Sequence, residues 1–289
     1  MLSSELDVVI VNYNTGNTLR TCVESVLASQ GVRIRCIIID NASVDGSVDF
    51  CRQYPQTEVL LVKNPCNVGF SAAVNQGMAL ASGAWVMLLN PDTTVPVNSL
   101  GELLALAHNT TGRVGALGCL VRNPDGSEQR GCRRDIPTLA KVLAHAFGLQ
   151  YLFPALRFNH TGRPLPTEAQ AVEAISGACM LLNRQAYKSI GGFDERYFLH
   201  FEDLDYCVRL ANQHWQILFV PFVEIEHKQG VSSARSPIKV ILHKHKSMLR
   251  YFYQHSGAQK VLLPVLLPFI LLRILAQITQ SCLLKGRDS

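Results

Sequence analysis

The chain lacks the short motifs that would identify a metal ribbon, a redox site or a nucleotide-binding loop. None of its nine cysteines forms a CxxC pair, which excludes a zinc ribbon and a thioredoxin-type site. Neither GxxxxGK(S/T) nor, after the first strand-like run, GxGxxG occurs. If the protein binds a nucleotide, the diphosphate must therefore be neutralised by other groups.

Charged residues are also scarce, at 17% of the 289 residues, whereas hydrophobic residues make up 48%. This composition excludes intrinsic disorder and is sufficient for a sizeable core. The net charge of +5 is unevenly placed, because residues 227–289 carry ten bases and one acid and so contribute +9. An acidic body with a basic C-terminal arm predicts an anionic neighbour, either lipid or nucleic acid.

The cysteines are scattered, and several lie within apolar runs, which predicts buried, reduced thiols in a cytosolic protein. The first residues contain no basic segment followed by an apolar core. We therefore do not expect a secretion signal.

The first ninety residues alternate between strand-like and helix-like patterns. Apolar runs rich in β-branched residues predict strands at 8–11, 34–39, 59–62 and 85–89. Helical spacing predicts helices at 17–28, 47–54 and 70–81. This order is typical of a mostly parallel, doubly wound α/β sheet, which binds ligands at the carboxyl ends of its strands.

The pattern is less regular after residue 120. We expect a hairpin turn at 123–126, a loop at 150–168, a strand at 172–182, a turn at 191–194, a helix from about 203 to 213 and an extended segment at 217–226.

The segment 239–287 begins with mixed bases and aromatics and ends in a long apolar run, 261–284. Pro264, Pro268 and Arg273 argue against a helix that spans the bilayer. We expect a helix that lies in the plane of a membrane surface. Packing on the domain or on a partner subunit, and a true span, are the alternatives.

Carboxylates follow two of the strand-like runs. Asp40 follows the second run, and Asp92 follows the fourth. Such positions lie at the mouth of the crevice in an open α/β sheet, although a single Asp there can also cap the next helix or turn. Because Mg²⁺ and Mn²⁺ bind carboxylates together with substrate phosphates, Asp92 is the expected ligand of a divalent cation.

Further polar residues have two interpretations each. Glu202, Asp203 and Asp205 either stabilise a helix N-terminus or supply a general base. His227, after an extended stretch, is either an ordinary surface or core residue or a metal ligand. The basic cluster that contains Arg133 and Arg134 is either a solvated loop or a contact for phosphate groups.

Six motifs occur in an order and at a spacing that resemble the family 2 inverting glycosyltransferases, which have the GT-A fold. They are Val11-Asn12-Tyr13-Asn14, Asp40-Asn41-Ala42-Ser43-Val44-Asp45-Gly46-Ser47, Asn67-Val68-Gly69-Phe70, Asn90-Pro91-Asp92, Gly191-Gly192-Phe193-Asp194-Glu195 and Glu202-Asp203-Leu204-Asp205. The resemblance covers residues 5–255 and is strongest to bacterial rhamnosyltransferase-like members.

The resemblance implies a role for each matching position. The nucleotide-sugar would contact Asn12, Tyr13, Asn14, Asp40, Asn67, Gly69, Asn75 and Asn90. Asp203 would be the catalytic base, with Glu202 and Asp205 as rival assignments, and His227 would complete the cation site with Asp92. Asn90 replaces the first carboxylate of an Asp-x-Asp motif, so weaker metal binding is expected.

The implied activity is metal-dependent transfer of a sugar, L-rhamnose from dTDP-rhamnose as the first choice, with inversion. The acceptor would be a glycan on a polyprenyl diphosphate, in bacterial cell-surface polysaccharide synthesis. UDP-galactofuranose or a UDP-hexosamine as donor, and a catalytically silent nucleotide-sugar-binding scaffold, are the alternatives. Nucleic acid is not expected as a partner, because no recognition motif accompanies the basic charge.

The expected organisation is a glycosyltransferase domain at 1–235 and a helical, membrane-associating arm at 236–289. Within the domain, 1–120 would bind the nucleotide and 121–235 would hold the acceptor and the catalytic residues. The protein would be cytoplasmic and peripheral on the inner face of the cell membrane, and a homo-oligomer is left open.

Overall fold

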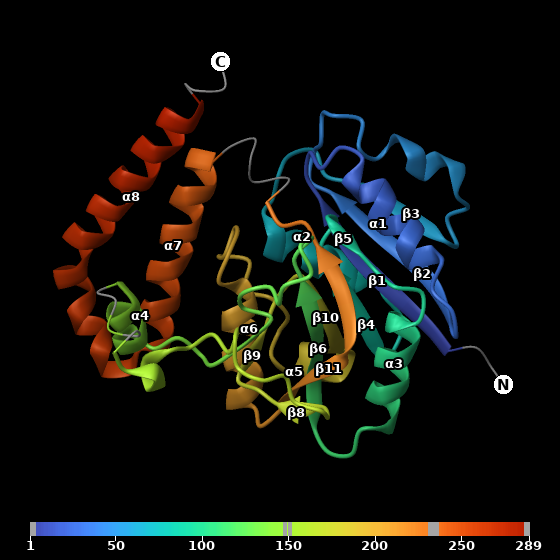
Figure 1. Cartoon of the computed structure of the whole chain (residues 1–289). Helices are drawn as coiled ribbons and strands as arrows, with labels where there is room; N and C mark the ends of the chain where they lie inside the picture. The colour runs from blue at the N-terminus through green and yellow to red at the C-terminus, as the bar shows by residue number, and fades with distance from the viewer. Residues whose placement is uncertain (1–3, 147–148, 150–151, 231–236, 286–289) are drawn as a thin grey trace.

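A nine-stranded mixed sheet forms the centre of the molecule in the computed structural model, which describes residues 4–146, 149, 152–230 and 237–285 (Figure 1). The strand order is β3-β2-β1-β4-β10-β6-β11-β5, and β8 pairs with β11. The strands are β1 Ser4–Asn12, β2 Val32–Asp40, β3 Val59–Lys63, β4 Trp85–Leu89, β5 Thr93–Thr94, β6 Val114–Arg122, β8 Gln170–Ala171, β10 Cys179–Asn183 and β11 Gln216–His227.

The sheet is mostly parallel. Strands β3, β2, β1 and β4 are parallel to one another, and β6 and β11 are parallel to each other, whereas β10 is antiparallel to both of its neighbours. The short strands β5 and β8 run antiparallel to β11. A second, two-stranded sheet pairs β7 Arg133–Arg134 with β9 Ala174–Ile175.

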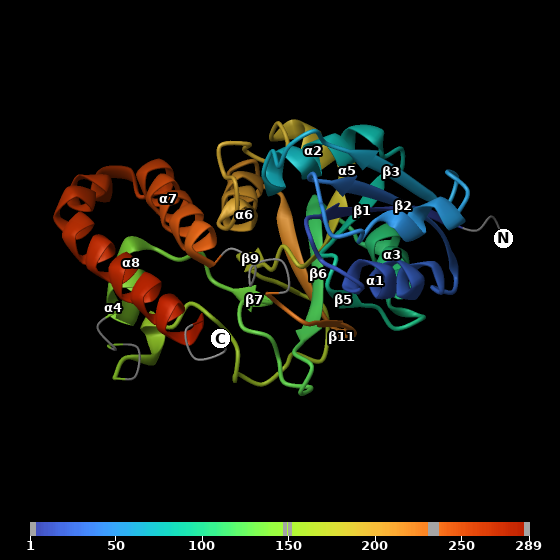
Figure 2. The ribbon, with the colours of Figure 1, turned by 90° about the horizontal axis from the view of Figure 1, so that it is seen from above.

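Helices cover both faces of the main sheet. The α-helices are α1 Thr18–Leu27, α2 Phe70–Leu80, α3 Ser99–Asn109, α4 Leu139–Ala146, α5 Arg184–Ser189, α6 Glu202–Asn212, α7 Pro237–His255 and α8 Leu263–Lys285. The 3₁₀ helices are η1 Asp49–Gln53, η3 Pro154–Leu156 and η5 Gly257–Leu262. Helices α1 and α3 lie on one face, and α2, α5 and α6 lie on the other (Figure 2).

Strand β1 shows why its sequence is apolar without interruption. Val8 and Ile10 belong to the core on the α1 side, whereas Val9 and Val11 belong to the core on the α2 side. A parallel strand that is buried on both faces needs apolar side chains at every position. The four strands predicted in the first ninety residues are confirmed.

Three local predictions need correction. The segment predicted as a helix at 47–54 contains only the 3₁₀ helix η1. The strand predicted at 172–182 is divided between β9, which pairs in the small sheet, and β10, which enters the main sheet, with Gly177 in the loop between them. The segment predicted as a loop at 150–168 includes η3.

Helices α7 and α8 pack against each other beside α6 and α4 (Figures 1 and 2). Tyr251 and Phe252 of α7 are buried in the core on the α6 side, as is Leu263 at the start of α8. Helix α8 continues through Pro268, although that residue has no backbone N–H to donate to the helix. The expected boundary at 235/236, and the end of the arm beyond 285, lie outside the described residues.

Most of the outer surface of α8 is apolar and exposed. Residues Gly257–Ser281 have a mean hydropathy of 2.3, only 6% of that window is buried, and by length and composition alone this is the one described helix able to cross a membrane. The exposed side chains on it include Val265, Leu267, Phe269, Leu271, Leu272 and Leu275.

The cysteines follow their sequence prediction with one exception. Of the eight cysteines whose side chains the structure describes, seven are buried and Cys66 is exposed, and all eight are free thiols. Burial, the main cause, raises the pKa of Cys22 and Cys207 to about 12. Such thiols are unreactive and serve as small apolar core residues.

Candidate active site

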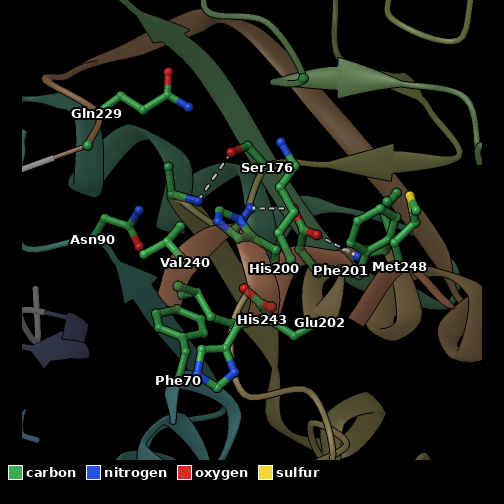
Figure 3. A pocket seen from close by; sticks show the side chains of 18 of the residues that line it. Phe70, Asn90, Ser176, His200, Phe201, Glu202, Gln229, Val240, His243 and Met248 are labelled. Carbon is green, nitrogen blue, oxygen red and sulfur yellow. Dashed lines mark hydrogen bonds between the residues drawn. The ribbon is translucent and has the colours of Figure 1, made fainter. Parts of the chain in front are cut away.

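A cavity of about 870 Å³ opens at the carboxyl ends of the central strands. Its wall is formed by the residues that follow β1 and β4, by the end of β11, and by α6, α7 and α8 (Figure 3). Of the predicted site residues, the cavity is lined by Tyr13, Asn67, Asn90, Asp92, Arg134, Glu202, Asp203 and His227. Segments far apart in the sequence therefore meet as the sheet topology predicts.

Asp92 and His227 form one polar pair in this wall. His227 Nε2 lies 3.0 Å from Asp92 Oδ1, and both side chains are buried. The pairing of β5 with the end of β11 fixes this geometry, because Thr93 lies opposite His227. Asn90 Nδ2 lies 3.3 Å from the same His227 nitrogen.

Gln129 determines which nitrogen of His227 carries hydrogen. Its Oε1 lies 2.6 Å from His227 Nδ1, while its Nε2 donates to His227 O at 3.1 Å and to Asn123 Oδ1 at 2.9 Å. Because these donations fix the amide orientation, Oε1 accepts from Nδ1–H. His227 Nε2 is then left to face the Asp92 carboxylate, with its lone pair available in the neutral imidazole.

This arrangement fits a divalent cation whose other ligands are substrate phosphates and water. Among the described residues, no group of three or more His, Cys, Asp or Glu side chains is arranged to hold a metal. The protein offers one carboxylate, Asp92, and one imidazole, His227. Mg²⁺ and Mn²⁺ are commonly bound by one or two carboxylates together with substrate phosphates and water. The predicted cation ligands, Asp92 and His227, are therefore adjacent in the cavity wall.

Asp203 lies in another part of the wall, at the start of α6. Its Oδ2 lies 2.5 Å from Arg134 Nη2 and accepts from the Gly177 N–H at 3.3 Å. A side chain at Gly177 would crowd this carboxylate, because a Cβ there would lie 3.3 Å from Asp203 Cβ. Arg134 and the loop between β9 and β10 therefore orient Asp203 toward the cavity.

The backbone that leads into α6 is strained. His200 and Phe201 both have positive φ, 66° and 68°, which is uncommon for residues other than glycine. Such strain persists only where the surroundings fix it, and it is concentrated at functional sites. Here it turns the chain so that Glu202 and Asp203 both reach the cavity.

Glu202 differs from Asp203 in its surroundings. It is 8% exposed, and its Oε2 has no hydrogen-bond partner among the described residues. Burial, followed by the neighbouring charge of Asp203, raises the pKa of Glu202 to about 8. Glu202 is therefore mostly protonated at neutral pH, and Asp203, held by Arg134, is the better placed proton acceptor.

The predicted nucleoside contacts after β1 and β2 are held by one another. Asn12 is fully buried, and its Nδ2 lies 2.9 Å from Asp40 Oδ1, 3.0 Å from Ser43 Oγ and 2.9 Å from Ser47 Oγ. Asn14 Oδ1 accepts from the backbone of the same loop. Asn12, Asn14 and Asp40 do not line the cavity and shape the loop at 41–47 instead.

Four other predicted residues also lie outside the cavity wall. Gly69 has φ of 91°, and a Cβ there would lie 2.9 Å from Phe198, so glycine is needed for the turn into α2. Asn75 binds the backbone of Phe193 and the hydroxyl of Tyr187. Partners inside the protein also hold the last two residues, Asp205 and Arg133.

The comparisons with known proteins agree with this geometry. Residues 7–191, more than half of the chain, match the model of the glycosyl transferase family 2. The chain is 33% identical over 271 residues to the N-acetylglucosaminyl-diphospho-decaprenol L-rhamnosyltransferase of Mycobacterium tuberculosis, covering 89% of this chain and 87% of the relative. The chain belongs to glycosyltransferase family 2. The resemblance inferred from the six motifs is confirmed.

Two more distant relatives extend the comparison. The low-salt glycan biosynthesis hexosyltransferase Agl10 of Haloferax volcanii is 21% identical over 235 residues, or 80% of this chain and 69% of the relative. The mannosyltransferase PcManGT of Pyrobaculum calidifontis, solved with GDP-Man and Mn²⁺, gives a TM-score of 0.56 at 17% identity, covering 96% of this chain and 74% of that one. At this identity the structural likeness shows the fold alone, and it confirms the GT-A expectation.

Several cavity residues of this glycosyltransferase were missed by the motif analysis. Gln129 and Gly177 orient His227 and Asp203, yet neither belongs to one of the six motifs. Lys244 and Arg273 line the cavity from α7 and α8. In the sequence, Arg273 is notable only because it interrupts an apolar run. This interruption argues against a helix that spans the bilayer and does not indicate a cavity residue.

Proposed function

We propose that this glycosyltransferase moves L-rhamnose from dTDP-rhamnose onto an N-acetylglucosamine acceptor carried by a polyprenyl diphosphate. The observation that carries the proposal is the similarity to the mycobacterial rhamnosyltransferase, which extends along 89% of this chain and 87% of that one. The cavity supports the transfer of a sugar by this chain. It contains the Asp92–His227 pair at one point and Asp203, paired with Arg134, at another.

Asp203 would act as the general base. It accepts the proton of the acceptor hydroxyl while that oxygen attacks the anomeric carbon of the donor. The bond from this carbon to the nucleoside diphosphate breaks, and its electron pair leaves with the diphosphate. Attack from the face opposite the leaving group inverts the configuration, and no covalent enzyme intermediate is needed.

Arg134 and the Gly177 N–H hold the carboxylate in place for this step. Asp92 and His227 would hold the divalent cation, which when bound neutralises the leaving diphosphate. Asn12 and Asp40 would support the nucleoside from behind, because they hold the loop at 41–47.

The catalytic step can be tested directly with purified protein. We would assay dTDP-rhamnose, UDP-galactofuranose and UDP-N-acetylglucosamine with N-acetylglucosamine on a short polyprenyl diphosphate, in Mn²⁺ or Mg²⁺. Transfer from dTDP-rhamnose alone, with inversion seen by NMR, is the expected result. Transfer from another donor would replace the sugar, and donor binding without transfer by a folded sample would favour the silent scaffold.

The protein would work at the cytoplasmic face of the membrane, with residues 237–285 as its membrane-associating arm. Replacing Leu271 and Leu275, which are 58% and 60% exposed, by Glu is expected to abolish sedimentation with anionic vesicles. Val44→Glu, at a position 89% exposed on the nucleotide side, is the matched control. Unchanged vesicle binding by the double variant would contradict the placement of α8 on the membrane.

A further inference from the structure

The part of the cavity wall that comes from the arm is basic. Lys239 and Lys244 of α7 and Arg273 of α8 line it, and Arg130 lines it from the loop before β7. No acidic residue of α7 or α8 lies among them, because neither helix contains Asp or Glu. The carboxylates of the cavity come from elsewhere in the wall: Asp92 follows β4, and Glu202 and Asp203 begin α6.

Arg273 lies on the face of α8 that is turned toward the cavity. Leu263, Leu266 and Ile270 recur at helical spacing on that face, and the first two pack into the core. At the next positions of the same face, Arg273 and Gln277, the helix lines the cavity with polar side chains.

Lys244 is held beside other cations without a carboxylate partner. Partial burial in the wall, the largest cause, and the charges of Arg273 and Arg130 lower the pKa of Lys244. Neither Lys244 nor Arg273 forms an ion pair with any residue that the structure describes. A bound anion would relieve this mutual repulsion.

We propose that Lys244 and Arg273 form a subsite for the diphosphate of the lipid-linked acceptor. This inference rests on the proposed function and names a binding site within it. A diphosphate needs several cationic donors, and an ammonium beside a guanidinium supplies both a point charge and a planar fork.

The position of the subsite favours the acceptor over the donor as the source of the diphosphate. In the proposed function, the donor diphosphate would lie at the cation held by Asp92, which follows β4, and by His227, at the end of β11. Lys244 and Arg273 belong to the helices whose outer side chains are exposed and apolar. A polyprenyl chain in the membrane would therefore bring its diphosphate to these two residues, and a cavity of about 870 Å³ is near the upper end of the usual range for one small ligand.

The test compares two acceptors and two single variants. Lys244→Gln and Arg273→Gln would be assayed with N-acetylglucosamine on a short polyprenyl diphosphate and with octyl N-acetylglucosaminide, which has no phosphate. Lys246→Gln is the matched control, because Lys246 is exposed on the same helix but does not line the cavity. Calorimetry with dTDP-rhamnose and Mn²⁺ reports donor binding separately.

We expect each cavity variant to raise the KM for the diphosphate acceptor about tenfold or more, with donor affinity unchanged. Turnover of the octyl acceptor should not differ between these variants, the control and the wild type. Weaker donor binding in the variants would assign the cations to the donor and overturn the inference, as would an unchanged KM. If the wild-type protein uses neither acceptor, the proposed function itself has failed, which is a different outcome.

Discussion

The proposed nucleotide side, the residues behind the cavity wall at the ends of β1 and β2, and the arm side, residues 237–285, differ in how their polar groups are satisfied. On the nucleotide side, Asn12, Asp40, Ser43 and Ser47 bind one another inside the protein. On the arm side, Lys244 and Arg273 make no ion pair with any described residue, and the nearest charges are repulsive. One side is complete without a ligand, whereas on the other side the proposed acceptor diphosphate would supply the anion that the cations lack.

This difference separates two uses of polar residues at a site. Buried groups that bind one another stabilise the fold and give a loop its shape, so losing one should affect stability first. Exposed cations that lack partners cost the fold little, so losing one should affect the ligand only. Asp203 lies between these cases, since its carboxylate is oriented by Arg134 yet lines the cavity.

The largest effect should follow from replacing the proton acceptor. Asp203→Asn is expected to lower kcat by about a thousandfold, because general base catalysis contributes roughly 10²–10⁴. Donor affinity, measured by calorimetry, should be unchanged. Glu202→Gln should retain most of its turnover, and a large loss in that variant together with an active Asp203→Asn would transfer the role to Glu202.

Stability should respond most on the nucleotide side. Asn12→Ala removes the amide shared by Asp40, Ser43 and Ser47, and about 2–4 kcal/mol of unfolding free energy should be lost in urea denaturation. Arg273→Gln on the arm side should change it by less than about 0.5 kcal/mol. Similar losses of unfolding free energy in Asn12→Ala and Arg273→Gln would remove the distinction between the two sides. Asn98→Ala, at an exposed helix start without a side-chain cap bond, is the control.

A smaller effect is expected at Gln129, which orients the predicted cation ligand His227. Gln129→Met removes the acceptor for His227 Nδ1–H, so the affinity for Mn²⁺ in the presence of dTDP should fall about tenfold. Gln213→Met, at an exposed position after α6, should have no effect. Calorimetric titration with Mn²⁺ measures both, and equal affinities in the two variants would contradict the orienting role of Gln129.

Local patterns were sufficient to predict the first four strands but not the centre of the sheet. Strand β6 has neighbours on both sides, yet no element was predicted there, because Gly115 and Gly118 weaken the strand pattern. The structure requires these glycines. A Cβ at Gly118 would lie 2.8 Å from Ile175, and one at Gly115 would lie 2.9 Å from Trp215.

The residues of the site likewise fall into those that local patterns predict and those that they do not. Asp92 and Asp203 were predictable because they lie in short motifs, next to a strand end and a helix start. Gln129, Lys244 and Arg273 reach the cavity only through packing between distant segments, which no local pattern encodes. Asn12 and Asp40 are both predicted to contact the nucleotide-sugar, but the structure places them behind the cavity wall, where they bind each other.

The smallest expected effect concerns Glu202, and its sign follows from its pKa. Because the folded-state pKa, about 8, exceeds the ordinary value of 4.5, the folded protein binds the proton more tightly than the unfolded chain. Its contribution to stability is therefore complete below about pH 4.5 and is lost as the pH rises to about 8. Glu202→Gln removes this loss, so the unfolding free energy of the variant relative to wild type should rise between pH 5 and pH 8. Urea denaturation at pH 5 and at pH 8 measures this change, with exposed Glu102→Gln as control.

A difference between variant and wild type that does not change with pH would mean that Glu202 is already ionised in the folded protein. The contrast between Glu202 and Asp203 would then be lost.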